Sequence, residues 1–183
     1  TLRGARLVAG ADVIVYDNLV APPILELAPV EAERIYVGKK AADHSLPQDE
    51  INLLLLKLAR ENKRVVRLKG GDPFIFGRGG EEMELLVDAG IHVEVIPGVT
   101  AAAGVAAYAG IPLTHREHAQ SVVFATGFLK EGKLDLDWPM LARPQQTVVI
   151  YMGISRLADI CAQLVAHGLP PSTPAGVIER GTT

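Results

Sequence analysis

The chain has 183 residues, of which 49% are hydrophobic and 21% charged, with a formal net charge of −3. A chain of this length buries about 70% of its unfolded surface, so neither a disulfide nor a structural metal is needed for stability. Its single cysteine excludes an internal disulfide and is most compatible with a reducing cytosol. The longest aliphatic run, Leu53–Leu56, is too short to span a bilayer, and the acidic balance gives no overall footprint for nucleic acid.

Short apolar runs alternate with helical patterns along the chain. A helix is expected at the N-terminus, and further helices around Ile51–Leu58, Glu81–Ala89 and Ala101–Ala109. The predicted strands are Ala11–Tyr16, Arg34–Val37, Arg64–Leu68, His92–Ile96, Ser121–Thr126, Thr147–Tyr151 and Ala175–Ile178. Most of these strands are apolar throughout, which is typical of a largely parallel sheet covered by helices on both faces. The sequence therefore predicts an α/β fold.

A break in this pattern at Gly110–Pro112 predicts a domain boundary near Pro112. We expect an N-terminal α/β domain over residues 1–112 and a C-terminal α/β domain over residues 113–183. The chain begins on a helical pattern and stops just after a strand. We therefore expect the first strand of the N-terminal domain to be missing and the C-terminal domain to be truncated.

The densest motif is a Gly-rich loop that follows the strand Arg64–Leu68. Gly70 and Gly71 come at the carboxyl end of that strand, where open α/β sheets bind ligands. Glycines there allow a ligand to approach the backbone closely. The loop matches neither a P-loop nor a dinucleotide fingerprint, because Gly-Lys-Ser/Thr is absent and Glu82 replaces the third glycine. The alternative is a turn in which Asp72 serves as a cap.

Charged residues also follow the predicted strands. Asp17 and Lys39 each come just after a strand, so both are expected at one sheet edge, where they are able to exchange protons. A turn cap and a solvated lysine are the competing interpretation. Arg78, Glu81 and Arg116, with nearby lysines, favour a phosphate or polycarboxylate ligand, or else an ordinary solvated surface.

His115 and His118 have a spacing that can hold a metal on a helix. No cysteine or third histidine lies nearby in the sequence, so exposed or hydrogen-bonded histidines explain the spacing better. No metal site is expected.

Several longer motifs resemble those of the uroporphyrinogen-III C-methyltransferases of the tetrapyrrole methylase family. The matching segments are Tyr16-Asp17, Val37-Gly-Lys39, Pro47 to Asn52, Arg64 to Glu82, Ile96 to Thr100 and Ala109 to Arg116. The resemblance covers essentially the whole chain. It implies two α/β domains with S-adenosylmethionine in the cleft between them, in a homodimer. From the composition, we expect this homodimer to be cytoplasmic and to bind neither nucleic acid nor membrane. The implied enzyme methylates uroporphyrinogen III at C2 and C7 to give precorrin-2, for sirohaem, cobalamin or haem d1 synthesis, and releases S-adenosylhomocysteine.

The resemblance also implies roles for individual residues. Asp17 matches the proton acceptor of the family and Lys39 the proton donor, while Arg78, Glu81 and Arg116 match residues of the substrate cleft. The implied cofactor positions are Gly70, Gly71, Asp72, Ile75, Thr100, Ala101, Met152 and Gly181. The proline-containing first loop of the family is absent from this chain.

Three alternatives remain open. A later corrin-ring methylase, such as a precorrin-4 methyltransferase, shares the fold and the cofactor. A non-catalytic nucleoside-binding module would use the loop Gly70–Gly80 and give no methylated product. An interaction or dimerisation piece is the third alternative.

Overall fold

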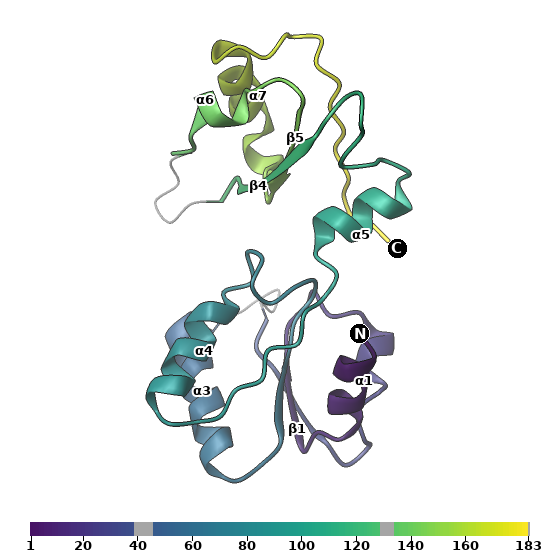
Figure 1. Cartoon of the computed structure of the whole chain (residues 1–183). Coiled ribbons are helices and arrows are strands. Elements are labelled where there is room, and N and C mark those ends of the chain that lie inside the picture. Colours follow the sequence, from purple (N-terminus) through teal and green to yellow (C-terminus); the bar gives the residue numbers. More distant parts are fainter. Residues whose placement is uncertain (39–45, 129–133, 183) are drawn as a thin grey trace. The chain divides into compact units, whose positions relative to one another are not determined.

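The computed structural model describes residues 1–38, 46–128 and 134–182. Within them the chain forms two compact α/β units, Thr1–Thr100 and Ala101–Thr183 (Figure 1). The α/β class predicted from the sequence is confirmed. The break between the units falls before α5 (Ala101–Tyr108) rather than at the expected boundary near Pro112. Contacts within the second unit explain this difference, since Ala102 N–H donates to the Tyr151 hydroxyl at 2.9 Å.

The first unit is built on a parallel sheet in the order β2-β1-β3. Its strands are β1 (Val13–Tyr16), β2 (Glu33–Tyr36) and β3 (Val65–Leu68). Its helices are α1 (Leu2–Ala9), α2 (Pro22–Leu25), α3 (Gln48–Arg60) and α4 (Gly79–Asp88). In Figure 1, α1 lies on one side of β1, with α3 and α4 on the other.

Apolar residues on both faces of β1 hold the sheet between its helices. Val13 and Val15 pack with Ile51, Leu55 and Leu58 of α3 on one face. Ile14 packs with Val8 of α1 and with Ala28 and Ala32 on the other. Because successive strand residues point to opposite faces, a strand covered on both sides must be apolar throughout. This arrangement confirms the interpretation of the continuous apolar runs.

The second unit holds a parallel pair of strands, β4 (Ser121–Thr126) and β5 (Gln146–Tyr151). The other elements are α5, α6 (Trp138–Leu141), the 3-10 turn η1 (Ile154–Arg156) and α7 (Leu157–Ala166). Trp138 and Leu141 of α6 and Ile160 of α7 form the buried core with Ala125 of β4.

Two predicted strands are wrong within the described residues. His92–Ile96 and Ala175–Ile178 form no strand, because neither pairs with another strand in the part of the chain that the structure describes. The first segment is instead held by side chains: Glu94 accepts two hydrogen bonds from Arg3, at 2.6 and 2.8 Å. The second segment is exposed at all four positions, so no packing stabilises a strand there.

None of the helices in the described ranges combines the length and apolarity needed to cross a bilayer.

Candidate active site

The carboxyl edge of the first sheet carries Asp17, immediately beyond β1. Its Oδ1 accepts a hydrogen bond from Leu19 N–H at 3.0 Å, and its Oδ2 accepts one from Arg67 Nη2 at 3.1 Å. The first bond is that of the turn cap considered from the sequence; the second joins the end of β1 to β3. Lys39, the predicted proton donor, lies outside the described residues.

Behind Asp17 is a largely buried network of charged groups. Arg67 Nε donates to Glu82 Oε1 at 3.2 Å, and Lys69 Nζ donates to the same oxygen at 3.3 Å. Gln48 adds a third hydrogen bond to Glu82 Oε1 at 3.1 Å. The Glu82 side chain is only 6% exposed. Such a buried carboxylate is tolerable because cations and hydrogen-bond donors surround it.

Burial governs the ionisation of Lys69 in this network. Desolvation lowers the pKa of the Lys69 ammonium, and the neighbouring Arg67 cation lowers it further, while Glu82 opposes both effects. Lys69 and Arg67 are therefore engaged inside the protein rather than free to bind an external anion.

Two further cations next to β3 are engaged in ion pairs at its other end. Arg64 precedes β3, at its amino end, and pairs with Asp12 at 2.7 Å. Lys63 pairs with Glu61 at 2.9 Å and with Glu33 at 3.4 Å. Both cations therefore lie at the amino end of β3, away from the edge that carries Asp17.

The Gly-rich loop between β3 and α4 is tightly folded. A Cβ atom on Gly70 would lie 2.6 Å from the backbone oxygen of Leu19, so only glycine fits there without a shift. Asp72 accepts hydrogen bonds from Phe74 N–H at 2.9 Å and from Gly98 N–H at 3.0 Å. Asp72 therefore joins the loop to the segment before Thr100 through hydrogen bonds. This structural role is compatible with the predicted cofactor role.

Two non-glycine residues of this loop have left-handed backbones, Phe76 with φ 51° and Arg78 with φ 58°. Such conformations cost of order 1 kcal/mol or more and gather at functional sites. Arg78 also forms a bidentate ion pair with Glu81, at 2.9 and 2.6 Å, in which both side chains are about half exposed. The structure therefore brings together two of the predicted substrate-cleft residues.

The predicted positions of the second unit converge on α5. Ala101 is the first residue of that helix, and the Tyr151 hydroxyl, next to Met152, binds the following N–H group. A Cβ atom on Gly181 would lie 2.5 Å from the Val105 side chain, so Gly181 packs directly on α5. Met152 has φ 55° and is 52% exposed, which is unusual for a methionine that serves only as packing. Thr100 is the last residue of the first unit.

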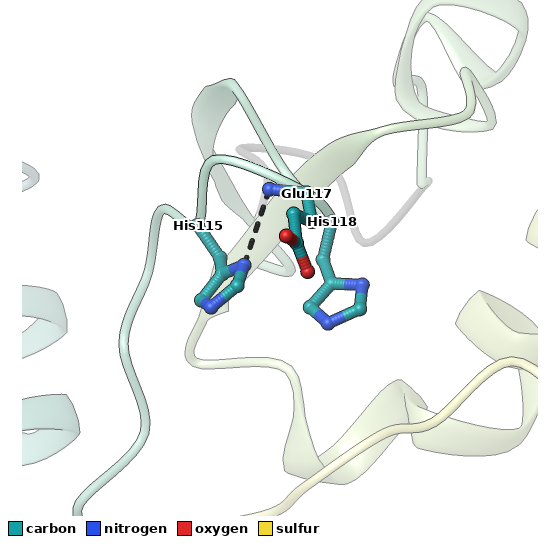
Figure 2. A group of neighbouring side chains, drawn as sticks. All are labelled: His115, Glu117 and His118. Carbon is teal, nitrogen blue, oxygen red and sulfur yellow. Dashed lines mark hydrogen bonds between the residues drawn. The ribbon is translucent and has the colours of Figure 1, made fainter.

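Arg116 lies in an exposed turn after α5, where its backbone carbonyl accepts a hydrogen bond from Gln120. Its guanidinium forms no ion pair within the described ranges. The same turn brings His115, Glu117 and His118 together, with potential ligand atoms within 4.8 Å of one another (Figure 2). However, His115 Nδ1 already accepts a hydrogen bond from Glu117 N–H, and the two imidazole rings are stacked with centroids 4.6 Å apart. Metal binding by both rings would have to break this arrangement.

A pocket of about 480 Å³ lies beside this turn in the second unit. It is lined by residues that include His118, Arg143 and Gln146. Among the predicted cofactor and catalytic residues that the structure describes, none lines this pocket, so its size alone does not make it the candidate site.

Sequence reasoning missed the role of Glu82 and the pairing of Arg67 with Asp17. A signal was present, since Glu82 lies four residues before Leu86, which packs on the core, and Arg67 interrupts an apolar strand. A charge on the inward face of a helix opposite a charge in a buried strand is the pattern of an internal ion pair.

These features place the chain among α/β proteins with a tightly folded Gly-rich loop after a parallel strand. The family model of tetrapyrrole (corrin/porphyrin) methylases matches residues 1–183, so the chain belongs to that family. The match confirms the family that the sequence motifs indicated.

Particular relatives sharpen the comparison. Over 183 residues the chain is 61% identical to the siroheme synthase of Nitrosospira multiformis. The alignment covers the whole of this chain and 39% of that protein. The chain thus spans about two fifths of the length of the curated relatives it matches. The crystal structure of uroporphyrin-III C-methyltransferase from Thermus thermophilus with bound S-adenosylhomocysteine is 44% identical, with a TM-score of 0.77 over 93% of this chain and 71% of that one. Cobalt precorrin-4 methyltransferase is 27% identical, with a TM-score of 0.78 over 92% of this chain and 69% of that one.

Proposed function

We propose that this chain carries the uroporphyrinogen-III C-methyltransferase activity of its protein. In this proposal S-adenosylmethionine donates two methyl groups in turn, to C2 and C7 of uroporphyrinogen III, and the product precorrin-2 enters sirohaem synthesis. Asp17 accepts protons and Lys39 donates them, while Arg78, Glu81 and Arg116 bind or orient the substrate.

The choice of substrate rests on sequence identity. Two methyltransferase structures resemble this chain equally in fold, but differ in how identical their sequences are to it. The two methyltransferase structures have TM-scores of 0.77 and 0.78, so the fold does not distinguish their substrates. Identity does, at 44% with the uroporphyrin-III enzyme against 27% with the precorrin-4 enzyme. The segment from Arg64 to Glu82, which is the most specific motif of the chain, supports the same choice.

The proposed cofactor positions suit an adenosyl ligand because a ligand is able to reach them. Gly70, Gly71, Ala101 and Met152 are exposed, and Asp72, Ile75, Thr100 and Gly181 are partly exposed. When bound, S-adenosylmethionine supplies a methyl group that is already activated as an electrophile.

The residues of this chain then have positioning and proton-transfer tasks. Transfer to an electron-rich pyrrole carbon depends mainly on alignment of the reacting groups. After a ring carbon has gained the methyl group, the macrocycle loses a proton. A carboxylate such as Asp17 is suited to accept this proton. The substrate is a polycarboxylate, and guanidinium groups such as Arg78 and Arg116 bind carboxylates through charge-assisted hydrogen bonds.

An anaerobic incubation of the full-length protein with uroporphyrinogen III and S-adenosylmethionine, followed by mass spectrometry, tests the proposal. We expect a product that is two methyl groups heavier. A parallel incubation with a precorrin-4 substrate is the control for the alternative corrin-ring methylase. Methylation of that substrate alone would replace the proposed function, and cofactor binding without any methylated product would favour a nucleoside-binding module.

The homodimer implied by the resemblance and the cytoplasmic location expected from the composition stay predictions. Light scattering coupled to size-exclusion chromatography of the full-length protein tests the first.

A further inference from the structure

We propose that Arg67 is a positioning residue that aims the Asp17 carboxylate, and that Glu82 in turn holds Arg67. This inference rests on the proposed function, in which Asp17 accepts a proton from the substrate. Arg67 acts through Asp17 and has no contact with the substrate in this proposal.

The two hydrogen bonds of Asp17 leave its carboxylate little freedom to rotate. Leu19 N–H holds Oδ1 at 3.0 Å from within the turn, and Arg67 Nη2 holds Oδ2 at 3.1 Å from the neighbouring strand. Each carboxylate oxygen has two lone-pair sites, so one on each oxygen remains available to accept a proton. Without Arg67 the carboxylate would keep only its local turn bond, which leaves the side chain free to tilt about that single contact.

Arg67 is itself fixed on several sides, as a positioning group must be. It lies opposite Val15 in the register of β3 with β1. Its Nη1 donates to the backbone oxygens of Leu68 at 2.9 Å and Val15 at 3.4 Å, and its Nε donates to Glu82 at 3.2 Å. The planar guanidinium uses its remaining edge for Asp17, and the side chain is only 13% exposed.

Glu82 completes the network from α4. Its Oε1 accepts hydrogen bonds from Arg67, Lys69 and Gln48, at 3.1 to 3.3 Å. Glu82 and Asp17 together offset the charges of Arg67 and Lys69, so this group of two cations and two carboxylates is neutral overall. Neutrality allows two cations to stay next to each other in a largely buried place.

A double-mutant cycle between Arg67 and Asp17 in the full-length protein tests the proposal. The variants are Arg67→Gln, Asp17→Asn and the two combined, with methyl transfer measured under single-turnover conditions and S-adenosylhomocysteine affinity measured by calorimetry. We expect Arg67→Gln to lower the rate roughly 10- to 100-fold, because a carboxylate misplaced by about 1 Å loses that much. The affinity for S-adenosylhomocysteine should stay within about twofold of the wild-type value. In the Asp17→Asn background, Arg67→Gln should lower the rate little further, because the effects of residues that act as a unit are non-additive.

Arg64→Gln is the matched control, since Arg64 also pairs with an aspartate beside the same sheet but at its opposite end. It should leave the rate unchanged. If circular dichroism shows that Arg67→Gln is unfolded, Arg67→Lys replaces it, because lysine keeps a cation in the network. The double-mutant cycle of Arg67→Lys with Asp17→Asn is then interpreted in the same way.

Three results would overturn the proposal. A full rate in Arg67→Gln would show that Asp17 needs no such support, and an equal fold-loss in both backgrounds would show that Arg67 acts independently of Asp17. A wild-type rate in Asp17→Asn would remove the role of Asp17, and this inference with it. Methylation by the wild-type protein would then still support the proposed function.

Discussion

Individual charged residues in the first unit have two different environments. Arg67, Lys69 and Glu82 are largely buried at the carboxyl edge of the sheet, whereas Arg64 and Asp12 form an exposed pair at its amino edge. Position in the sequence separates the two only in part, because Arg64, Arg67 and Lys69 all lie in or beside the same short strand, β3. Burial separates them, since an exposed pair contributes little to stability and a buried one is costly to break.

The exposed pair gives a pH dependence that can be measured. Hydrogen bonds from the Arg64 side chain, and then from its backbone N–H, lower the pKa of Asp12 from 3.8 to about 2. A carboxylate with a lowered pKa stabilises the fold above its ordinary pKa and loses that contribution as the pH falls through the lowered value. We therefore expect wild type and Asp12→Asn to differ in unfolding midpoint above about pH 5, and to converge toward pH 2.

Thermal melts of both proteins between pH 2 and pH 7 check this expectation. Glu94→Gln removes another exposed arginine-bound carboxylate and serves as the control, with the same sign of effect. A difference between wild type and Asp12→Asn that persists unchanged to pH 2 would contradict the assignment.

At the scale of elements, the start of α4 decides the shape of the Gly-rich loop. Gly79 N–H donates to the Pro73 backbone oxygen at 3.0 Å, and a Cβ atom on Gly79 would lie 2.5 Å from that oxygen. Gly80, the next residue, has nothing within 4 Å of such an atom. Adjacent glycines in one helix thus serve different purposes, which the Gly-Gly dipeptide alone does not reveal.

This difference predicts opposite effects of alanine at the two positions. Gly79→Ala should lower the free energy of unfolding by about 1–3 kcal/mol, because it forces the loop backbone to move. Gly80→Ala should raise it by up to about 1 kcal/mol, because alanine favours the helix and restricts the unfolded chain. Urea unfolding of the full-length protein measures both values. Equal effects at the two positions would argue against the close packing of the loop on Pro73.

For the whole molecule, the proposed cofactor residues come from both compact units. Gly70, Gly71, Asp72, Ile75 and Thr100 belong to the first unit, and Ala101, Met152 and Gly181 to the second. If all of them bind S-adenosylhomocysteine, ligand binding must stabilise segments in both units, since a ligand stabilises the state that it binds.

Hydrogen exchange measured by mass spectrometry tests this with the full-length protein. At about 100 times its dissociation constant, S-adenosylhomocysteine should slow exchange in peptides from the loop after β3 and from the end of β5. A peptide covering α1, which holds none of these residues, is the internal control. Slower exchange in the first unit alone would remove Ala101, Met152 and Gly181 from the proposed site.

The sequence by itself determined the α/β class, five of the seven predicted strands and the family, because apolar periodicity and local motifs are properties of neighbouring residues. The tertiary structure alone decided that His92–Ile96 and Ala175–Ile178 form no strand, since a strand exists only through its partner. It alone showed that Arg67 reaches Asp17 and that Glu82 lies buried behind them. Arg67 is 15 positions from Glu82 and 50 positions from Asp17 in the sequence. Local patterns signal that Arg67 and Glu82 are buried charges, but only the packing of β1, β3 and α4 decides which partners they meet.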